Sequence, residues 1–156
     1  EERYKELLEE IGRLRAEKDL YQQQLKELEP IKSITVELSK LYSLELFDVI
    51  LAQVSEDKLR LIGQIIGDSG FAYYTRFEEG KYTVLIITEK NADIEKKLRE
   101  AGVRKYELQE GKSPFQLYNE ISERINQINT ILERTREELA KKVKTEENYI
   151  KNVYGK

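Results

Sequence analysis

The chain contains no cysteine and no histidine. Without cysteine, disulfide bonds and thiolate chemistry are excluded. Without histidine, the usual general base and the commonest metal ligand are missing. Long apolar runs are missing too, because the longest strongly apolar stretch, Val84–Ile87, is far too short to cross a bilayer. These absences argue against catalysis by the usual side chains and against direct insertion of this chain into a membrane.

Methionine is also absent, position 1 included, and no signal peptide or lipidation motif opens the chain. We therefore expect the chain to be a piece of a longer protein. Its net charge is −3 at pH 7, and its sequence pI is about 5.4. This balance gives no broad basic surface, so nucleic acid is not an expected partner. A charged content of 37% with 39% hydrophobic residues is typical of long, solvated helices.

What the sequence does contain is apolar residues at heptad spacing near both ends, in residues 1–29 and 113–156. Alternating steps of three and four residues are typical of a coiled-coil seam, and an apolar stripe on a helix needs a partner. The segment between the two stretches returns the chain to its starting point, so we expect antiparallel pairing within one molecule, with Leu14 near Leu132. Pairing between two molecules is the alternative. The expected seam residues are Leu7, Ile11, Leu14, Tyr21, Leu25, Leu28, Ile121, Ile125, Ile128, Leu132 and Leu139.

The ends of these two helices carry clear signals. Pro30 lacks an N–H group and disfavours helical backbone at the residue before it, so the first helix should stop there. At the start of the second helix, Ser113 suits the N-cap and Pro114 suits the first helical position. Gln116 occupies the partner position of a capping box.

The middle of the chain, residues 30–112, has the pattern of a small lobe of strands and helices. Apolar, β-branched runs predict strands, and the run at 46–54 is typical of a strand buried on both faces. After a connecting helix the order is β-α-β-β-α-β, which is typical of a ferredoxin-like sheet with two helices on one face. We therefore predict an α+β fold, with this lobe inserted in a long antiparallel two-helix coiled-coil arm. The predicted elements are a connecting helix at 31–43, strands at 46–54, 71–77, 81–88 and 103–108, and helices at 55–66 and 91–101.

The second predicted strand is rich in aromatic residues. Phe71, Tyr73 and Phe77 alternate onto one face, and Tyr74 lies on the other. Exposed aromatics on such a sheet can stack nucleic-acid bases, but the third strand has the wrong residues for an RNA-recognition module. Two interpretations remain open: the aromatics belong to the core or lie beneath the connecting helix, or they bind a partner protein.

No catalytic or cofactor site can be built from the remaining motifs. Glu78 and Glu79 are adjacent carboxylates in a predicted hairpin turn, and adjacent side chains do not converge on one cleft. The Gly-Asp-Ser-Gly sequence at 67–70 lacks the length and the lysine of a phosphate-binding loop. We expect neither catalysis nor a bound cofactor in this chain.

Three stretches together carry a family resemblance. They are a strand with a Leu-rich helix (46–66, LFDVILAQVSEDKLRLIGQII), a strand followed by an acidic helix, a glycine cap and a short strand (82–108, YTVLIITEKNADIEKKLREAGVRKYEL), and a Ser-Pro start of the return helix (110–125, EGKSPFQLYNEISERI). This combination resembles the cytoplasmic N-terminal half of subunit I (subunit a) of archaeal and bacterial A/V-type rotary ATPases.

The resemblance implies a non-catalytic stator role. In that family such a segment is the distal lobe with its adjoining two-helix arm. It binds the peripheral stalk, a heterodimer of the E and G (or H) subunits, and helps to anchor the stator against rotor torque. The membrane domain, with its essential arginine, lies further along such proteins, so no arginine of this chain inherits that role. The remainder of subunit I and the membrane rotor complex are further implied partners, and the implied location is the cytoplasmic face of the membrane.

Two other classes of function fit parts of the pattern. ACT-type regulatory domains share the β-α-β-β-α-β order and bind small ligands, but they usually carry a glycine-rich turn where this chain has Val54-Ser55-Glu56. A coiled-coil arm of another large assembly, such as a chromosome-organising or tRNA-handling protein, would share the two long helices.

Overall fold

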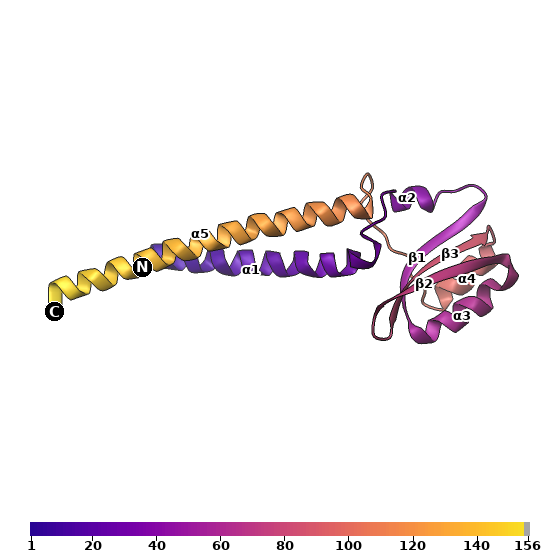
Figure 1. Cartoon of the computed structure of the whole chain (residues 1–156), viewed down its shortest axis with the longest axis horizontal. Helices are drawn as coiled ribbons and strands as arrows, with labels where there is room; N and C mark the ends of the chain where they lie inside the picture. The colour runs from indigo at the N-terminus through magenta and orange to yellow at the C-terminus, as the bar shows by residue number, and fades with distance from the viewer. Residues whose placement is uncertain (155–156) are drawn as a thin grey trace. The chain divides into compact units, whose positions relative to one another are not determined.

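The computed structural model describes residues 1–154, with side chains to Lys151. The last two residues of the predicted segment 113–156 therefore lie outside the described part. Helices and strands follow one another as Figure 1 shows. Their bounds are α1 Glu2–Leu28, a 3-10 turn Glu29–Ile31, α2 Leu38–Leu41, β1 Phe47–Ser55, α3 Glu56–Ile66, a 3-10 turn Gly67–Ser69, β2 Gly70–Glu78, β3 Lys81–Glu89, α4 Ala92–Glu100 and α5 Pro114–Tyr154.

The chain divides into two compact units. We call the first the arm: it contains Glu1–Glu29 and the chain from Tyr118 onward. We call the second the lobe: it contains Pro30–Leu117. The boundary predicted from the sequence lies at 112/113. The observed boundary follows Leu117, inside α5, so the first turn of that helix belongs to the lobe.

In the arm, α1 and α5 lie side by side and run antiparallel (Figure 1). One buried cluster joins them, and its members are Ile11, Leu14, Ile128 and Leu132. Polar pairs connect the two segments at three places along this seam, and they agree with the cluster on one antiparallel register. These pairs are Arg3 Nη2 to Glu138 Oε1 at 2.6 Å, Arg124 Nη2 to Glu17 Oε1 at 2.9 Å, and the Tyr118 hydroxyl to Glu29 Oε2 at 2.7 Å.

The lobe is built on a three-stranded antiparallel sheet with the order β1-β3-β2. β3 is the central strand, since it pairs with β1 on one side and with β2 on the other. The ladder between β2 and β3 is interrupted by a register shift between Arg76 and Glu78. The α+β class predicted from the sequence is thereby confirmed.

The helices α3 and α4 pack against one face of this sheet. Every second residue of the central strand, including Val84 and Ile86, points to that face, as the period of a strand requires. Together with the apolar stripes of both helices they form one buried cluster. The cluster contains Ala52, Val54, Ile62, Ile66, Val84, Ile86, Ile94, Leu98 and Val103.

Several helix ends are capped by side chains or by glycine, including the capping box predicted at Ser113 and Gln116. The backbone N–H of Ser113 donates to Gln116 Oε1 at 3.0 Å, and the N–H of Gln116 donates to Ser113 Oγ at 3.2 Å, which is a reciprocal capping box. Asn91 Oδ1 accepts from two backbone N–H groups in the first turn of α4. Gly102, at φ +83°, ends α4 because left-handed backbone favours glycine.

The predicted strand at 103–108 is wrong: among the described residues it is reduced to a single bridge, Ala52↔Lys105. The N–H of Tyr106 does donate to the carbonyl of Leu51 at 2.7 Å. However, the Tyr106 carbonyl accepts from the Tyr42 hydroxyl at 2.6 Å rather than continuing a ladder. A side-chain hydrogen bond therefore stands where the fourth strand was expected.

The predicted connecting helix at 31–43 is also wrong over most of its length. Only Leu38–Leu41 is α-helical, preceded by Glu37 in extended backbone. β-Branched residues such as Ile34 and Val36 lower the helix propensity of this stretch. The carbonyl of Ile34 instead accepts from the N–H of Phe115 at 3.0 Å, which satisfies one of the free donors at the start of α5.

Candidate docking surface on the lobe

The face of the sheet opposite α3 and α4 carries apolar residues from all three strands in register, and we call it the open face. Two residues of β2 and two of β1 flank the same two residues of the central strand. The result is a continuous apolar surface whose two halves differ in exposure. The facing pairs are Phe71 with Ile87, Tyr73 with Leu85, Val49 with Ile87, and Leu51 with Leu85.

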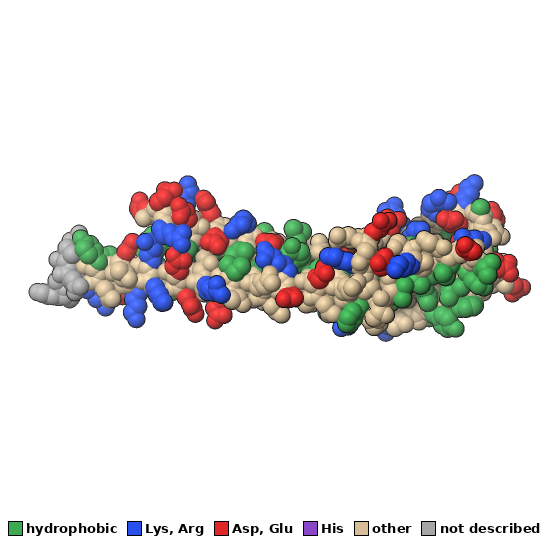
Figure 2. All heavy atoms as spheres, turned by 90° about the horizontal axis from the view of Figure 1, so that it is seen from above, with side chains coloured by type: hydrophobic (Ala, Val, Ile, Leu, Met, Phe, Trp, Pro, Cys, Tyr) green, Lys and Arg blue, Asp and Glu red, His purple; other side chains and the backbone are tan. Residues whose placement is uncertain are grey.

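The β2 half of the open face is exposed. Phe71 is 50% exposed and Tyr73 is 65% exposed, and their rings meet edge to face with centroids 5.3 Å apart. Contiguous exposed apolar side chains of this kind commonly mark binding surfaces. Figure 2 shows hydrophobic side chains gathered along one side of the lobe.

The other two predicted docking residues lie elsewhere. Tyr74 is 61% exposed but lies on the helix-covered side of the sheet, where its ring meets that of Tyr82 at 5.8 Å. Phe77 is half-buried and sits within the register shift of β2. The structure therefore brings Phe71 and Tyr73 together and separates Tyr74 from them by the thickness of the sheet. None of the four belongs to the buried core.

The β1 half of the open face is covered. Leu51 is buried, and the Tyr42 hydroxyl from the connection before β1 reaches the backbone carbonyls of Leu51, at 3.4 Å, and Tyr106, at 2.6 Å. Burial raises the pKa of Tyr42 to about 12, so the hydroxyl stays protonated, and remains a donor, to a higher pH than an ordinary tyrosine with a pKa of 10.0. Lys105 Nζ lies 4.6 Å from the centroid of the Tyr42 ring, within cation–π range.

Two further exposed apolar residues were not predicted. Phe47, 47% exposed, shares the open face with Val49 because the two lie two positions apart in one strand. Leu46, immediately before β1, is 77% exposed. The alternation of side chains along β1 could have placed Phe47 on the open face. The continuous apolar run at 46–54 instead favours a strand buried on both faces, so it gives no indication that Phe47 is exposed.

Most of the predicted seam residues are buried in the arm. Tyr21, Leu25 and Leu139 are half-buried, and Tyr21 and Leu139 pack against the cluster around Ile128. The buried seam residues are Leu7, Ile11, Leu14, Leu28, Ile121, Ile125, Ile128 and Leu132.

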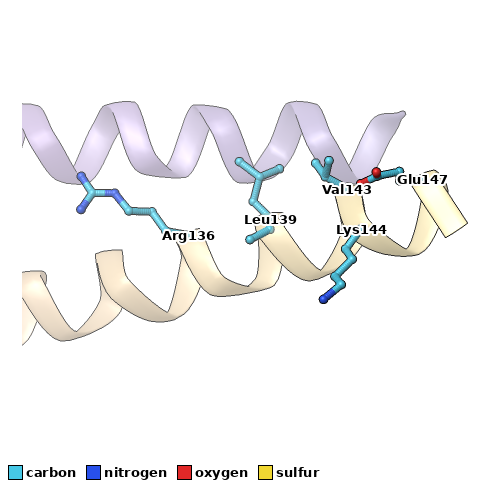
Figure 3. Close-up of a pocket in the computed structure, with 6 residues that line it drawn as sticks. Arg136, Leu139, Val143, Lys144 and Glu147 are labelled. Atoms are coloured by element: carbon cyan, nitrogen blue, oxygen red, sulfur yellow. The ribbon is translucent and has the colours of Figure 1, made fainter.

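A second apolar surface lies on α5 in the arm. A groove of about 540 Å³ runs along this helix, lined by residues from Arg136 to Glu147. Figure 3 shows Leu139 reaching toward α1 and Lys144 pointing away from it. Val143 in this groove is 52% exposed. The apolar stripe of α5 is therefore only partly covered by α1.

Neither surface has the features of a metal site. Among the described residues, no group of three or more histidine, cysteine, aspartate or glutamate side chains could hold a metal ion. Over the same residues, no helix has the length and apolarity needed to cross a membrane. The open face offers exposed aromatic side chains, and the groove on α5 offers apolar side chains beside Arg136, Lys144 and Glu147.

Known proteins with a similar sequence give an independent line of information. No protein-family model matches the chain. Over all 156 residues it is 89% identical to the A-type ATP synthase subunit I of Saccharolobus solfataricus (strain ATCC 35092 / DSM 1617 / JCM 11322 / P2). The resemblance to subunit I predicted from the sequence is confirmed. The chain spans 22% of the length of that subunit I relative.

The fold is similar to that of the cytoplasmic N-terminal domain of subunit I, homolog of subunit a, of V-ATPase, which is known from a crystal structure. The match has a TM-score of 0.52 and covers 90% of this chain and 48% of the other. Sequence identity is 15%, so this likeness concerns the fold alone.

Proposed function

We propose that this chain is a non-catalytic stator part of subunit I in an A-type rotary ATPase. The observation that carries the proposal is the 89% identity to an A-type ATP synthase subunit I over the whole chain. In this proposal the lobe binds the peripheral stalk, the heterodimer of the E and G (or H) subunits, at the cytoplasmic face of the membrane. The arm connects the lobe to the remainder of subunit I and the membrane rotor complex.

Features of both units support this role. A tether under torque benefits from packed helices, and the arm has a buried seam with polar pairs across it. The lobe offers the exposed pair Phe71 and Tyr73, and aromatic side chains are enriched where proteins bind partners. We interpret the lobe as a ferredoxin-like sheet with a reduced fourth strand, because Lys105 forms its bridge to β1, which pairs with β3 on its other side.

Calorimetric titration of an E/G heterodimer into the chain tests the proposal. We expect Phe71→Ala and Tyr73→Ala each to weaken binding by about tenfold or more, as truncation of a central interface aromatic does. Their melting temperatures should stay close to that of the parent chain because both side chains are exposed. Tyr74→Ala and Phe77→Ala test the other two docking residues predicted from the sequence. Phe77→Ala should also lower the stability of the fold, because Phe77 is half-buried.

The matched control is Tyr149→Ala. Tyr149 is 66% exposed on α5, against 65% for Tyr73 on β2. This variant should bind the heterodimer as tightly as the parent chain does. Absence of binding by the parent chain, or equal binding by Tyr73→Ala and Tyr149→Ala, would refute the proposed docking surface.

A further inference from the structure

The apolar part of the open face has a defined boundary at each end. Toward the hairpin between β2 and β3, the register places Thr75 and Gln53 on either side of Thr83, so the apolar rows give way to uncharged polar side chains. Toward the start of β1, the last facing pair is Phe47 with Glu89. The apolar surface therefore occupies the rows between these two ends and reaches all three strands.

Phe47 gives this surface a second exposed aromatic margin. It is 47% exposed on β1, whereas the exposed pair Phe71 and Tyr73 lies on β2, at the other side of the sheet. The residues of the central strand between them, Leu85 and Ile87, are half-buried. A single apolar partner segment can therefore contact both aromatic margins only by lying across the sheet.

The dimensions of this surface match one α-helix. Neighbouring strands lie about 4.8 Å apart, so β1 and β2 are separated by about 10 Å, close to the diameter of a helix. Phe47 faces position 89 of β3 and Tyr73 faces position 85, so the two aromatics are offset by four positions along the strands. This offset places them ~17 Å apart on a diagonal, which is the length of about three helical turns.

A sheet face also differs from a sheet edge in what it can bind. The hydrogen-bonding groups of the backbone lie in the plane of the sheet, so a segment lying on the face must satisfy its own backbone groups. A helix satisfies them internally and presents an apolar stripe. The opposite face of this sheet is already covered in that way by α3 and α4.

Acidic side chains border the end of the open face near Phe47. Glu89 faces Phe47 in the ladder, and Glu45 is exposed shortly before β1. Asp68 is exposed in the turn before β2. None of these three carboxylates has an ion-pair partner among the described residues. Lys90, next along the chain, offsets part of their charge, and the balance at this end remains negative.

From these features we infer that one amphipathic helix of the stalk heterodimer lies diagonally across the open face, from Phe47 to Tyr73. Its apolar stripe contacts both aromatic margins and Ile87, which lies midway along the diagonal. Its lysine or arginine residues lie toward Glu89 and Glu45. The inference rests on the proposed function and deepens it, because it adds Phe47 to the docking residues and assigns the class of partner segment.

Calorimetric titration of the E/G heterodimer tests the role of Phe47. We expect Phe47→Ala to weaken binding by about tenfold or more, as Tyr73→Ala should, because both truncate an interface aromatic. The matched control is Phe115→Ala, since Phe115 is 46% exposed and lies in the first turn of α5. This variant should bind as tightly as the parent chain. Circular dichroism of both variants checks that the fold is retained, which is expected at exposed positions.

A charge reversal tests the acidic border. Glu89→Lys should weaken binding by about threefold or more at low salt and by less at high salt, because it places a positive charge against a basic partner and salt screens that repulsion. Glu79→Lys is the matched control, since Glu79 is an exposed carboxylate in the turn between β2 and β3. If the two variants bind equally, the basic flank of the inferred helix is wrong.

Crosslinking tests whether the bound segment is a helix. The chain has no cysteine, so a benzophenone label can be attached to the single cysteine of Phe47→Cys or Tyr73→Cys. At concentrations above the dissociation constants of these variants, both labels should crosslink to one stretch of the heterodimer. Sites about eleven residues apart indicate a helix spanning ~17 Å, whereas an extended segment would place them about five residues apart.

The outcomes separate this inference from the proposed function. If Tyr73→Ala weakens binding but Phe47→Ala binds like Phe115→Ala, the proposed function stands and the diagonal helix is refuted. Crosslinked sites about five residues apart, or in widely separated stretches, also refute the helix. Absence of binding by the parent chain refutes the proposed docking itself, and the inference falls with it.

Discussion

The arm and the lobe bury their apolar residues in different ways. In the arm, each helix contributes one stripe, and Leu14 and Ile128 belong to a cluster that only two helices build. In the lobe, two strands, two helices and the residue after Gly102 all contribute to one cluster. β3 runs through its middle, with Val84 and Ile86 almost fully buried. The arm is therefore a repeated local arrangement, whereas the lobe depends on contacts between distant parts of the chain.

This difference suggests how each unit responds to a lost side chain. A seam position in the arm has neighbours from one facing helix, and the same arrangement recurs along the rest of the seam. A position on β3 has neighbours from several elements of the lobe core, so its loss affects them together. Stability need not be uniform across a chain, and separately packed units can open separately.

The largest expected effect comes from cavities in the two cores. Ile86→Ala in the lobe and Ile128→Ala in the arm each remove a side chain that is at most 1% exposed. We expect each to destabilise its own unit by about 2–5 kcal/mol, the usual cost of truncating a buried isoleucine to alanine. Hydrogen exchange resolves where the loss falls: Ile86→Ala should speed exchange in β1 and β3, and Ile128→Ala in α1 and α5.

The control for both cavities is Leu46→Ala, because Leu46 is 77% exposed and its truncation should change stability by less than about 0.5 kcal/mol. If either core variant raised exchange equally in the arm and the lobe, the two would unfold as one cooperative unit. The arm and the lobe would then differ in how their side chains pack but not in how they unfold.

An intermediate effect is expected at the Tyr42 hydrogen bond, which stands in the lobe where a fourth strand was predicted. Tyr42→Phe keeps the ring beside Lys105 but removes the hydroxyl that donates to the Tyr106 carbonyl. We expect a loss of about 1 kcal/mol at neutral pH, typical of one hydrogen bond. Chemical denaturation of the parent chain and the variant measures it.

The same pair of proteins should show a defined pH dependence. The pKa of Tyr42 rises from 10.0 to about 12 on folding, mainly through burial. A raised pKa means that the neutral hydroxyl stabilises the fold fully below pH 10 and that this contribution is lost as the pH rises toward 12. The stability difference between parent and Tyr42→Phe should therefore shrink over that interval. A difference that stays constant would place the hydroxyl outside the fold-stabilising contacts.

Local signals account for most of what could be predicted from the sequence. Heptad spacing, Pro30 and the capping box at Ser113 and Gln116 act within a few residues, and the structure has the helix ends they indicate. Likewise, Asn91 caps α4 through its own neighbours. Such signals specify helices because helical hydrogen bonds are local.

The errors lie where the deciding contact is distant in sequence. The strand expected at 103–108 is limited to one bridge, because the Tyr106 carbonyl accepts a hydrogen bond from the Tyr42 hydroxyl, 64 positions away in the sequence. For the candidate site, strand alternation correctly separates Tyr74 from Phe71 and Tyr73. It could not show which half of the open face is covered, because that depends on how the connection before β1 folds back.

The smallest expected effect concerns the polar pairs beside the seam of the arm. Glu17 Oε1 accepts from Nε and Nη2 of Arg124, at 3.3 and 2.9 Å, and this hydrogen bonding raises the pKa of the guanidinium. Both side chains are partly exposed. Glu17→Gln removes the charge with little change in shape, so we expect a small loss of stability that fades as salt screens the pair.

Thermal melts of the parent chain and Glu17→Gln at low salt and at about 1 M NaCl measure this effect, since the screening length falls to about 3 Å at the higher concentration. Glu9→Gln is the matched control at an exposed position of α1, and its small effect should not depend on Arg124. If Arg124→Gln abolished the difference between parent and Glu17→Gln, the pair would be an energetic contact. If the difference persisted unchanged, the apolar seam alone would hold the register of the arm.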